Sequence, residues 1–169
     1  SDGRTVTLTD DGTARTISRN ISTGVEATNS MFRLTGSSTL QIEGTETGGI
    51  TITGDSTDSA SSVNRMFTVG TSADRGSTLT LGKHVTVKDH YSSTAHGMCA
   101  IVYGTINIDG ATITNITGTK NGAILIYGKG YMTDGLITKN ETTGNGAAIQ
   151  VAKDSAVGSE FYMSGGEIS

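Results

Sequence analysis

The chain has 169 residues, of which 24 are glycine and 29 threonine, with no proline or tryptophan, and its formal net charge is −4. An acidic chain without a run of Lys or Arg is not expected to bind nucleic acid. The longest apolar run, residues 123–127, is far too short to cross a membrane, so we expect no membrane insertion. Low charge with many Thr, Ile and Val predicts an ordered all-β protein.

After a strand-like TVTLT at residues 5–9, three types of short strand recur in a fixed order along the chain. The first type comprises residues 31–36, 66–71, 98–104, 123–128 and 148–152. The second comprises residues 40–44, 79–83, 106–110, 131–135 and 162–166. The third and shortest comprises residues 50–53, 85–88, 112–115 and 136–139, with GEIS at the end. The connections within a type are too long for hairpins, which predicts that each type stacks as parallel strands in its own sheet.

The clearest repeat is NGAILIYG at residues 121–128 and NGAAIQVA at 145–152, 24 positions later. If 24 residues make one turn, the chain is an all-β, single-stranded right-handed parallel β-helix (β-solenoid) of about five to six coils with three strands per coil. We expect one domain over residues 1–169, with longer irregular coils over 1–103 and regular coils over 104–169. Both ends of the sequence fall within the repeat pattern, which suggests a fragment excised from a larger protein.

Corner residues are predicted where strands end. Gly104, Gly110, Gly128, Gly135 and Gly166 follow strands, and we expect positive φ there. Asn115 and Asn140 are expected to stack in a corner ladder and to bond backbone amides, although two simple turn asparagines explain the pattern equally well. The single Cys99 excludes an internal disulfide and is expected to be a small buried hydrophobe.

The segments GTINIDGATITNITGTKNGAILIYG, YMTDGLITKNETTGNGAAIQV and FYMSGGEIS cover roughly residues 104–169. They resemble the pectate-lyase-like right-handed β-helix repeats of bacterial cell-surface proteins of Gram-positive type, in which a "GGAI" strand, a "MSGGTIS" strand and an "N-T" corner recur. The resemblance implies a secreted or wall-anchored protein whose β-helical modules act as stalks or adhesive surfaces. The first hundred residues depart from the pattern, and the repeat implies a scaffold without implying an activity.

Polysaccharide lyases and hydrolases share the predicted fold and need clustered carboxylates, with Ca²⁺ in the case of the lyases. Asp109 and Asp134, 25 residues apart and each followed by Gly, are the nearest candidate pair. Turn formation accounts for an Asp-Gly pair without catalysis. We therefore expect no catalytic residue, no cofactor and no metal, and retain a lyase or hydrolase fragment acting on acidic polysaccharide as the alternative.

The densest polar segment, residues 83–91 with His96 shortly after, contains His84 and His90, so that all three histidines fall within thirteen residues. Imidazole with Asp is a common set of metal ligands. No HxH or HxxxH spacing occurs, however, so a polar loop at a corner is the favoured interpretation.

These observations predict a non-catalytic, monomeric binding or adhesion module of a bacterial cell-surface or secreted protein, with a ligand-free structural stalk as a further alternative. The partner would be a host protein, such as an antibody or matrix component, or a host glycan. Low aromatic content favours a protein, whereas a groove lined by stacked aromatic rings would favour a glycan. The candidate contacts are Arg65, Arg75, His90 and Tyr91, because loops on a rigid scaffold carry specificity and Arg and Tyr are enriched in binding hot spots.

Overall fold

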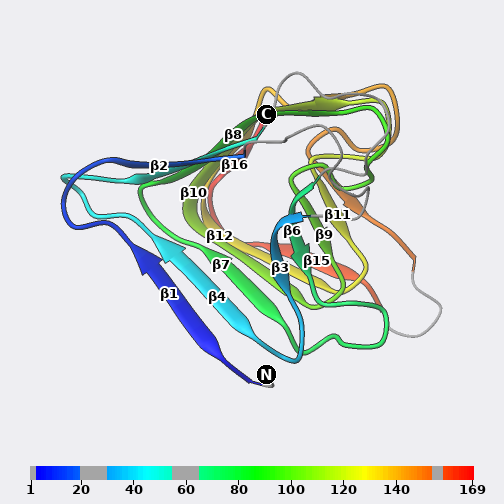
Figure 1. Ribbon diagram of the computed structural model, residues 1–169. Helices are drawn as coiled ribbons and strands as arrows, with labels where there is room; N and C mark the ends of the chain where they lie inside the picture. The colour runs from blue at the N-terminus through cyan, green and yellow to red at the C-terminus, as the bar shows by residue number, and fades with distance from the viewer. Residues whose placement is uncertain (1–2, 20–29, 55–64, 154–157) are drawn as a thin grey trace.

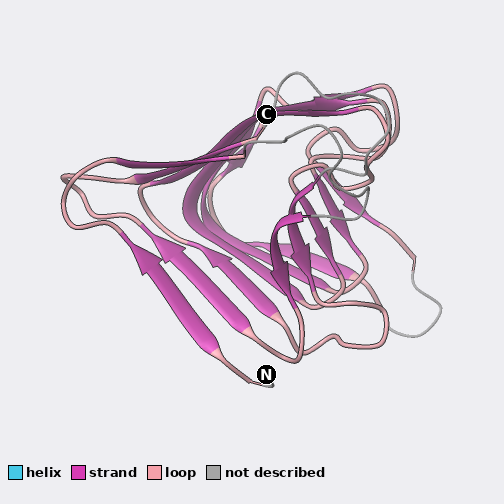
Figure 2. Cartoon of the chain, in the orientation of Figure 1, coloured by secondary structure: helices cyan, strands magenta, loops and turns pink. Residues whose placement is uncertain are grey.

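A computed structural model describes residues 3–19, 30–54, 65–153 and 158–169 of the chain. These residues form strands and connecting loops, without a helix, arranged as two parallel sheets (Figures 1 and 2). The strands are β1 (Thr5–Thr9), β2 (Arg15–Ser18), β3 (Ser30–Leu34), β4 (Thr39–Glu43), β5 (Ile50–Thr53), β6 (Arg65–Val69), β7 (Thr78–Leu81), β8 (Val85–Ser92), β9 (Ala100–Val102), β10 (Thr105–Gly118), β11 (Ile124–Ile126), β12 (Lys129–Thr138), β13 (Glu141–Thr142), β14 (Ile149–Val151), β15 (Glu160–Met163) and β16 (Glu167–Ile168).

The larger sheet has eleven strands and curls into a half-barrel (Figure 1). Its strands run in the order β1-β4-β7-β10-β8-β5-β2, while β12 and β13 pair with β10, and β15 and β16 pair with β12. The smaller sheet has five strands in the order β14-β11-β9-β6-β3 and stands across from the concave side of the larger one (Figure 1).

The predicted fold class, a single-stranded right-handed parallel β-helix with three strands per coil, is wrong. The structure has two sheets instead of three, because strands expected to belong to two sheets are continuous in β10 and β12. Within β10 the ladder to β12 shifts register between Ile108 and Thr112, around Gly110 with its φ of 103°. Such a bulge bends a strand without ending it. The outcome is a curled half-barrel of parallel strands with a separate parallel sheet beside it.

The glycines serve two different purposes. Gly110, Gly135 and Gly166 have φ values of 103°, 114° and 85°, as expected. Gly104 and Gly128 do not have positive φ. They are required because neighbouring carbonyl oxygens, that of Ser77 beside Gly104 and that of Tyr103 beside Gly128, occupy the space that a Cβ would need.

Asn115 and Asn140 do not stack on each other. Asn115 has a φ of 56° and donates from Nδ2 to Oδ1 of Asp89 at 3.1 Å. Asp89 of β8 and Lys139, which directly follows β12, flank it with the same left-handed backbone, both at φ 54°. Asn140, the residue after Lys139, is buried. Its Oδ1 accepts a hydrogen bond from the Ile116 N–H at 3.0 Å, and its Nδ2 donates to the Ile113 carbonyl at 3.2 Å.

The repeat NGAILIYG and NGAAIQVA forms neighbouring segments of the smaller sheet, but its spacing is not constant. The Gly122 N–H donates to the Asn145 carbonyl and the Ala123 N–H to the Ala147 carbonyl, so Gly146 is skipped. Ile126 consequently pairs with Val151, 25 residues away, whereas the asparagines are 24 apart.

The hydrophobic core lies between the two sheets and consists of columns of inward side chains, one from each strand. One column contains Ile42, Leu81, Ile108 and Met132, all at most 1% exposed. Burying an aliphatic side chain of this size stabilises the fold by about 1.5–3 kcal/mol. Cys99 is fully buried, as predicted, and burial raises the pKa of its thiol to about 12.

Replacing Asn140 by Ala is expected to lower the free energy of unfolding by about 2–3 kcal/mol, because the buried Ile116 N–H and Ile113 carbonyl lose their partner. The matched control is Asn115→Gly, which keeps the left-handed backbone at an exposed position and should change stability little. Urea unfolding of both variants measures the difference. Equal effects of the two substitutions would contradict the assigned role of Asn140.

Candidate functional site

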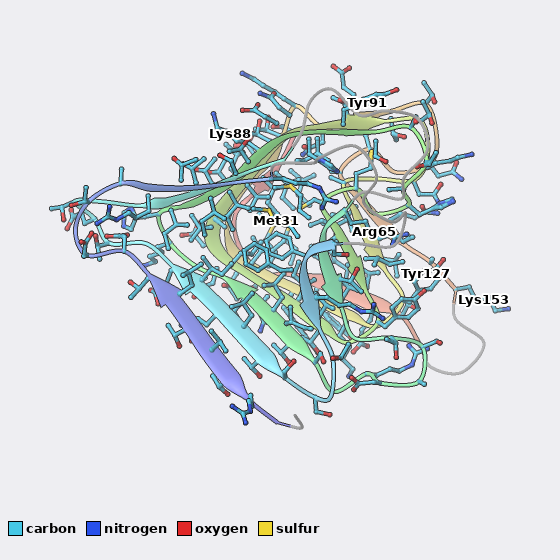
Figure 3. The ribbon with its side chains drawn as sticks, in the orientation of Figure 1. Met31, Arg65, Lys88, Tyr91, Tyr127 and Lys153 are labelled. Carbon is cyan, nitrogen blue, oxygen red and sulfur yellow. The ribbon has the colours of Figure 1, made fainter. Side chains whose placement is uncertain are left out.

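The four predicted contact residues lie on two different faces. Arg65 begins β6 on the smaller sheet, and Arg75 lies in the loop that follows this strand. His90 and Tyr91 lie in β8 of the larger sheet, not in a loop. Figure 3 shows Arg65 and Tyr127 on the side of the smaller sheet, well separated from Lys88 and Tyr91. The residues therefore define two candidate sites, which we consider in turn.

The first candidate is the outer face of the smaller sheet, which we call the Arg–Tyr surface: Arg33, Arg65, Arg75, Tyr103 and Tyr127. Pairing of Val69 with Val102, and of Val102 with Ile126, places the two tyrosines one above the other at the ends of β9 and β11. Their rings stack with centroids 5.1 Å apart and an interplanar angle of 11°. Arg75 lies over the Tyr103 ring, with Cζ 6.0 Å from the centroid, and donates from Nη1 to the Tyr127 carbonyl at 3.0 Å.

An open groove of about 430 Å³ crosses this surface. Among the described residues its lining combines two cations, three hydroxyl side chains, an aromatic ring and an aliphatic side chain, without a carboxylate. The lining residues are Arg33, Arg65, Thr68, Gly70, Thr71, Ser72, Ile101 and Tyr103. In a chain of net charge −4, this groove is a local region of positive charge.

Arg65 is held in place at the edge of the groove. Its Nε donates to the His96 carbonyl at 2.8 Å, which orients the guanidinium group. Burial lowers the pKa of Arg65, an effect that the nearby Tyr103 and Tyr127 oppose, yet an arginine remains charged at neutral pH. Within the described part of the chain, neither Arg33 nor Arg65 forms an ion pair with a carboxylate. The groove therefore presents positive charge that the surrounding side chains do not neutralise.

His96 and Lys120 extend the positive region beyond Arg65. The pKa of His96 is lowered from its ordinary value, first by partial burial and then by the positive charges of Lys120 and Arg65. Both His96 and Lys120 are exposed. Lys120 is distant in sequence from Arg65, so no pattern in the sequence predicts that both act on His96.

The second candidate is a groove of about 730 Å³ on the larger sheet. Its lining residues are Thr53, Gly54, Asp89, His90, Tyr91, Asn115, Thr117, Lys139 and Glu141. Here the charge of Asp89 is compensated, because the Nζ of Lys88 lies 3.1 Å from its carboxylate. The hydrogen bond that Asn115 donates, and then that of Lys88, lower the pKa of Asp89. His90 is only 1% exposed, so it belongs to the interior rather than to a contact surface.

The nearest candidate pair of carboxylates, Asp109 and Asp134, is engaged in local hydrogen bonds. No group of three or more His, Cys, Asp or Glu side chains able to hold a metal ion occurs among the described residues. Asp109 and Asp134 are neighbours in the ladder, as their spacing predicts. Thr133 Oγ1 donates to Asp109 at 2.7 Å, and the Gly135 N–H donates to Asp134 at 2.8 Å.

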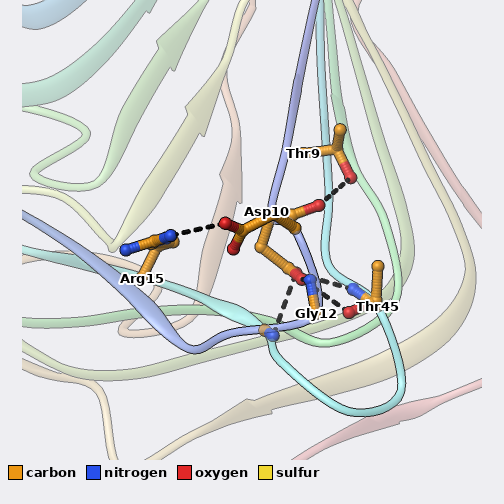
Figure 4. A network of polar contacts seen from close by, with 7 residues as sticks. Thr9, Asp10, Gly12, Arg15 and Thr45 are labelled. Carbon is orange, nitrogen blue, oxygen red and sulfur yellow. Dashed lines mark hydrogen bonds and ion pairs between the residues drawn. The ribbon is translucent and has the colours of Figure 1, made fainter.

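Asp10 is a further carboxylate whose role the sequence did not reveal. It is 8% exposed and accepts hydrogen bonds from the N–H groups of Gly12, Thr45 and Gly49 and from the Thr45 hydroxyl (Figure 4). These bonds, led by that of the Thr45 hydroxyl, hold the pKa of Asp10 far below its ordinary value. Asp10 thus fixes the connection after β4 to the one after β1, which is a structural role.

Comparison of the chain with models of protein families, with curated proteins and with solved structures found no match. The resemblance to pectate-lyase-like repeats of bacterial surface proteins therefore stays a prediction. A search of the described residues for a helix that could span a bilayer found none.

His96 is expected to titrate with a midpoint below 6.5, and Lys120→Met should move this midpoint upward, because it removes a positive neighbour. Because the pKa of His96 is lower in the folded protein, the unfolded chain binds the proton first as the pH falls. The free energy of unfolding therefore decreases as the pH drops from 6.5 through the pKa of His96 in the folded protein. Histidine NMR titrations measure the midpoint, with Lys83→Met as the charge-matched control. A midpoint at or above 6.5 in the folded protein would contradict the cationic environment.

Proposed function

We propose that the chain is a non-catalytic binding and adhesion module of a bacterial cell-surface or secreted protein, and that it binds an anionic glycan through the Arg–Tyr surface. The observation that carries this proposal is the groove itself, where Arg33 and Arg65 meet hydroxyl groups and Tyr103, and where the described lining residues include no neutralising carboxylate.

Each part of the groove matches one part of an acidic sugar. A guanidinium group presents a rigid fork of N–H donors that fits a carboxylate or sulfate group. Thr68, Thr71 and Ser72 offer hydroxyls that donate to or accept from sugar hydroxyls. The apolar faces of Tyr103 and Ile101 suit the C–H groups of a pyranose ring.

The location of the groove favours a glycan over a protein segment. The groove lies on the face of a sheet, where the backbone N–H and C=O groups are engaged in the ladders between β3, β6 and β9. An extended peptide is usually recognised by free backbone groups at a sheet edge, which a face does not offer. The sequence favoured a glycan if stacked aromatic rings lined a groove, and this condition is met in part: Tyr103 lines the groove and stacks on Tyr127, which lies outside the lining.

A binding role without catalysis is supported by the distribution of acidic groups. Hydrolysis of a glycosidic bond needs two carboxylates on either side of the bond, and the part of the groove lining that the structure describes contains none. Asp109 and Asp134, the nearest stacked pair, lie on the larger sheet, where Asp109 accepts a hydrogen bond from Thr133 of the neighbouring strand and Asp134 one from Gly135 of its own strand.

Arg65→Met is expected to weaken binding of hyaluronate or heparin oligosaccharides about 10- to 100-fold, because a hydrogen bond to a charged group contributes about 1.5–3 kcal/mol. Calorimetric titration measures the affinity. Binding should also weaken with added salt, since the groove is open to solvent.

The control is Lys83→Met, which removes one exposed positive charge from the larger sheet and should leave the affinity unchanged. Thermal unfolding of both variants tests whether Arg65→Met retains its fold. If neither oligosaccharide binds the folded protein, or if the two variants lose affinity equally, the assignment to the Arg–Tyr surface is wrong.

A further inference from the structure

The large apolar side chains that are exposed lie at the two ends of the strand stack. Among the described residues they are Val6 of β1 (56% exposed), Val151 of β14 (44%), Tyr162 and Met163 of β15 (56% and 44%) and Ile168 of β16 (39%). All of them belong to first or last strands of the sheets. The strands between keep their large apolar side chains covered, so the exposure is a property of the ends.

Within the described part of the chain, both ends also present unpaired strand edges. At the first end, β1, β2 and β3 each pair with a single strand, and at the last end β14, β15 and β16 do the same. Such edges offer free N–H and C=O groups to another strand. At the first end a largely apolar cavity of about 310 Å³ opens between the sheets, with Val6, Leu8 and Phe32 in its lining.

We propose that these ends bind each other, so that the first end of one copy of the chain stacks on the last end of another. In this arrangement β1, β2 and β3 of the second copy continue the ladders of β15, β16 and β14, respectively. The interaction goes beyond ligand binding and departs from the monomer expected from the sequence.

The columns of the core extend across such a junction without a break. The column of Leu8 ends at Met163, so the next residue would be Leu8 of the second copy. The column of Ile17 ends in the same way at Ile168. In the smaller sheet, the column of Leu34 ends at Val151. An apolar side chain therefore meets an apolar side chain in each of these columns, and exposed surface becomes buried.

The charges at the rims of the two ends are complementary. Thr5 and Glu160 are the first and last residues of one column, and Arg4 directly precedes Thr5. Thr16 and Glu167 are the first and last residues of another column, and Arg15 directly precedes Thr16. Glu160 and Arg15 also have partners within their own chain, Lys129 and Asp11. Rim charges of opposite sign mainly set orientation and selectivity, and here they favour contact between unlike ends.

Contact between like ends fits less well. Two first ends would bring Arg4 and Arg33 of one copy towards the same arginines of the other, and two last ends would do the same with Glu160 and Glu167. A two-fold axis between like ends would also reverse the strand direction and interrupt the columns. The unlike contact does not close on itself, so it predicts open chains of increasing length.

Two substitutions, each blocking one end, test the arrangement. Val6→Lys places a charge at the first end, and Met163→Lys does so at the last end, both at exposed positions whose side chains the monomer does not need to bury fully. Sedimentation velocity of the wild-type chain should show the weight-average mass rising at least about twofold between about 5 and 200 µM, and each variant alone should remain monomeric. An equimolar mixture of the two variants should form dimers and nothing larger, because each species retains one different free end.

Thr86→Lys is the charge-matched control, since Thr86 lies on β8 in the middle of the larger sheet, and it should associate like the wild type. Circular dichroism and thermal unfolding establish that the variants are folded. A wild-type chain that stays monomeric at about 200 µM overturns the proposal, because the ends then bind something other than a second copy. Association of one variant alone, or a mixture of variants that stays monomeric, overturns the head-to-tail arrangement.

Discussion

The structure depends on one constraint, the parallel alignment of each strand with the strand before it in its sheet. The apolar side chains of successive strands must lie in columns, because only then is the space between the sheets filled. In the column of Leu8, the steps from Ile42 to Leu81, Ile108, Met132 and Met163 are 39, 27, 24 and 31 residues. The columns are thus preserved while the connections vary, and each connection is free to carry residues that packing does not determine.

This constraint also explains what could be predicted of the fold. Alternation of apolar residues revealed the strands and the parallel pairing, since both leave a pattern in the sequence. The number of sheets left no such pattern. A glycine with positive φ serves equally well to end a strand or to form a bulge within it, and Gly110 does the latter. Only the hydrogen bonds on both sides of Gly110 decide between three sheets and two.

The candidate site could be predicted only in part, because side-chain direction depends on single-residue shifts. Val87 and His90 both point into the core of the larger sheet although an odd number of positions separates them, because Asp89 has a left-handed backbone and shifts the alternation. His90, expected as a surface contact, is therefore buried. Arg65 and Arg75 were recognised by residue type. Their neighbours Arg33 and Tyr103 were not, since these are brought together by the exact pairing of Arg33 with Thr68 and of Val69 with Val102.

The same constraint connects the two proposals. Outward positions lie outside the core between the sheets, so a column such as Arg33, Thr68, Ile101, Leu125 and Gln150 changes character from strand to strand and can form a single site. Inward columns keep their character to both ends, so the ends remain compatible with each other. Copies stacked end to end would present one Arg–Tyr surface per copy, all on the same side and at a fixed separation. Weak binding of single sugar units by an open groove would then add up along a polymeric glycan, since linked sites bind a repeating ligand far more tightly than one site does.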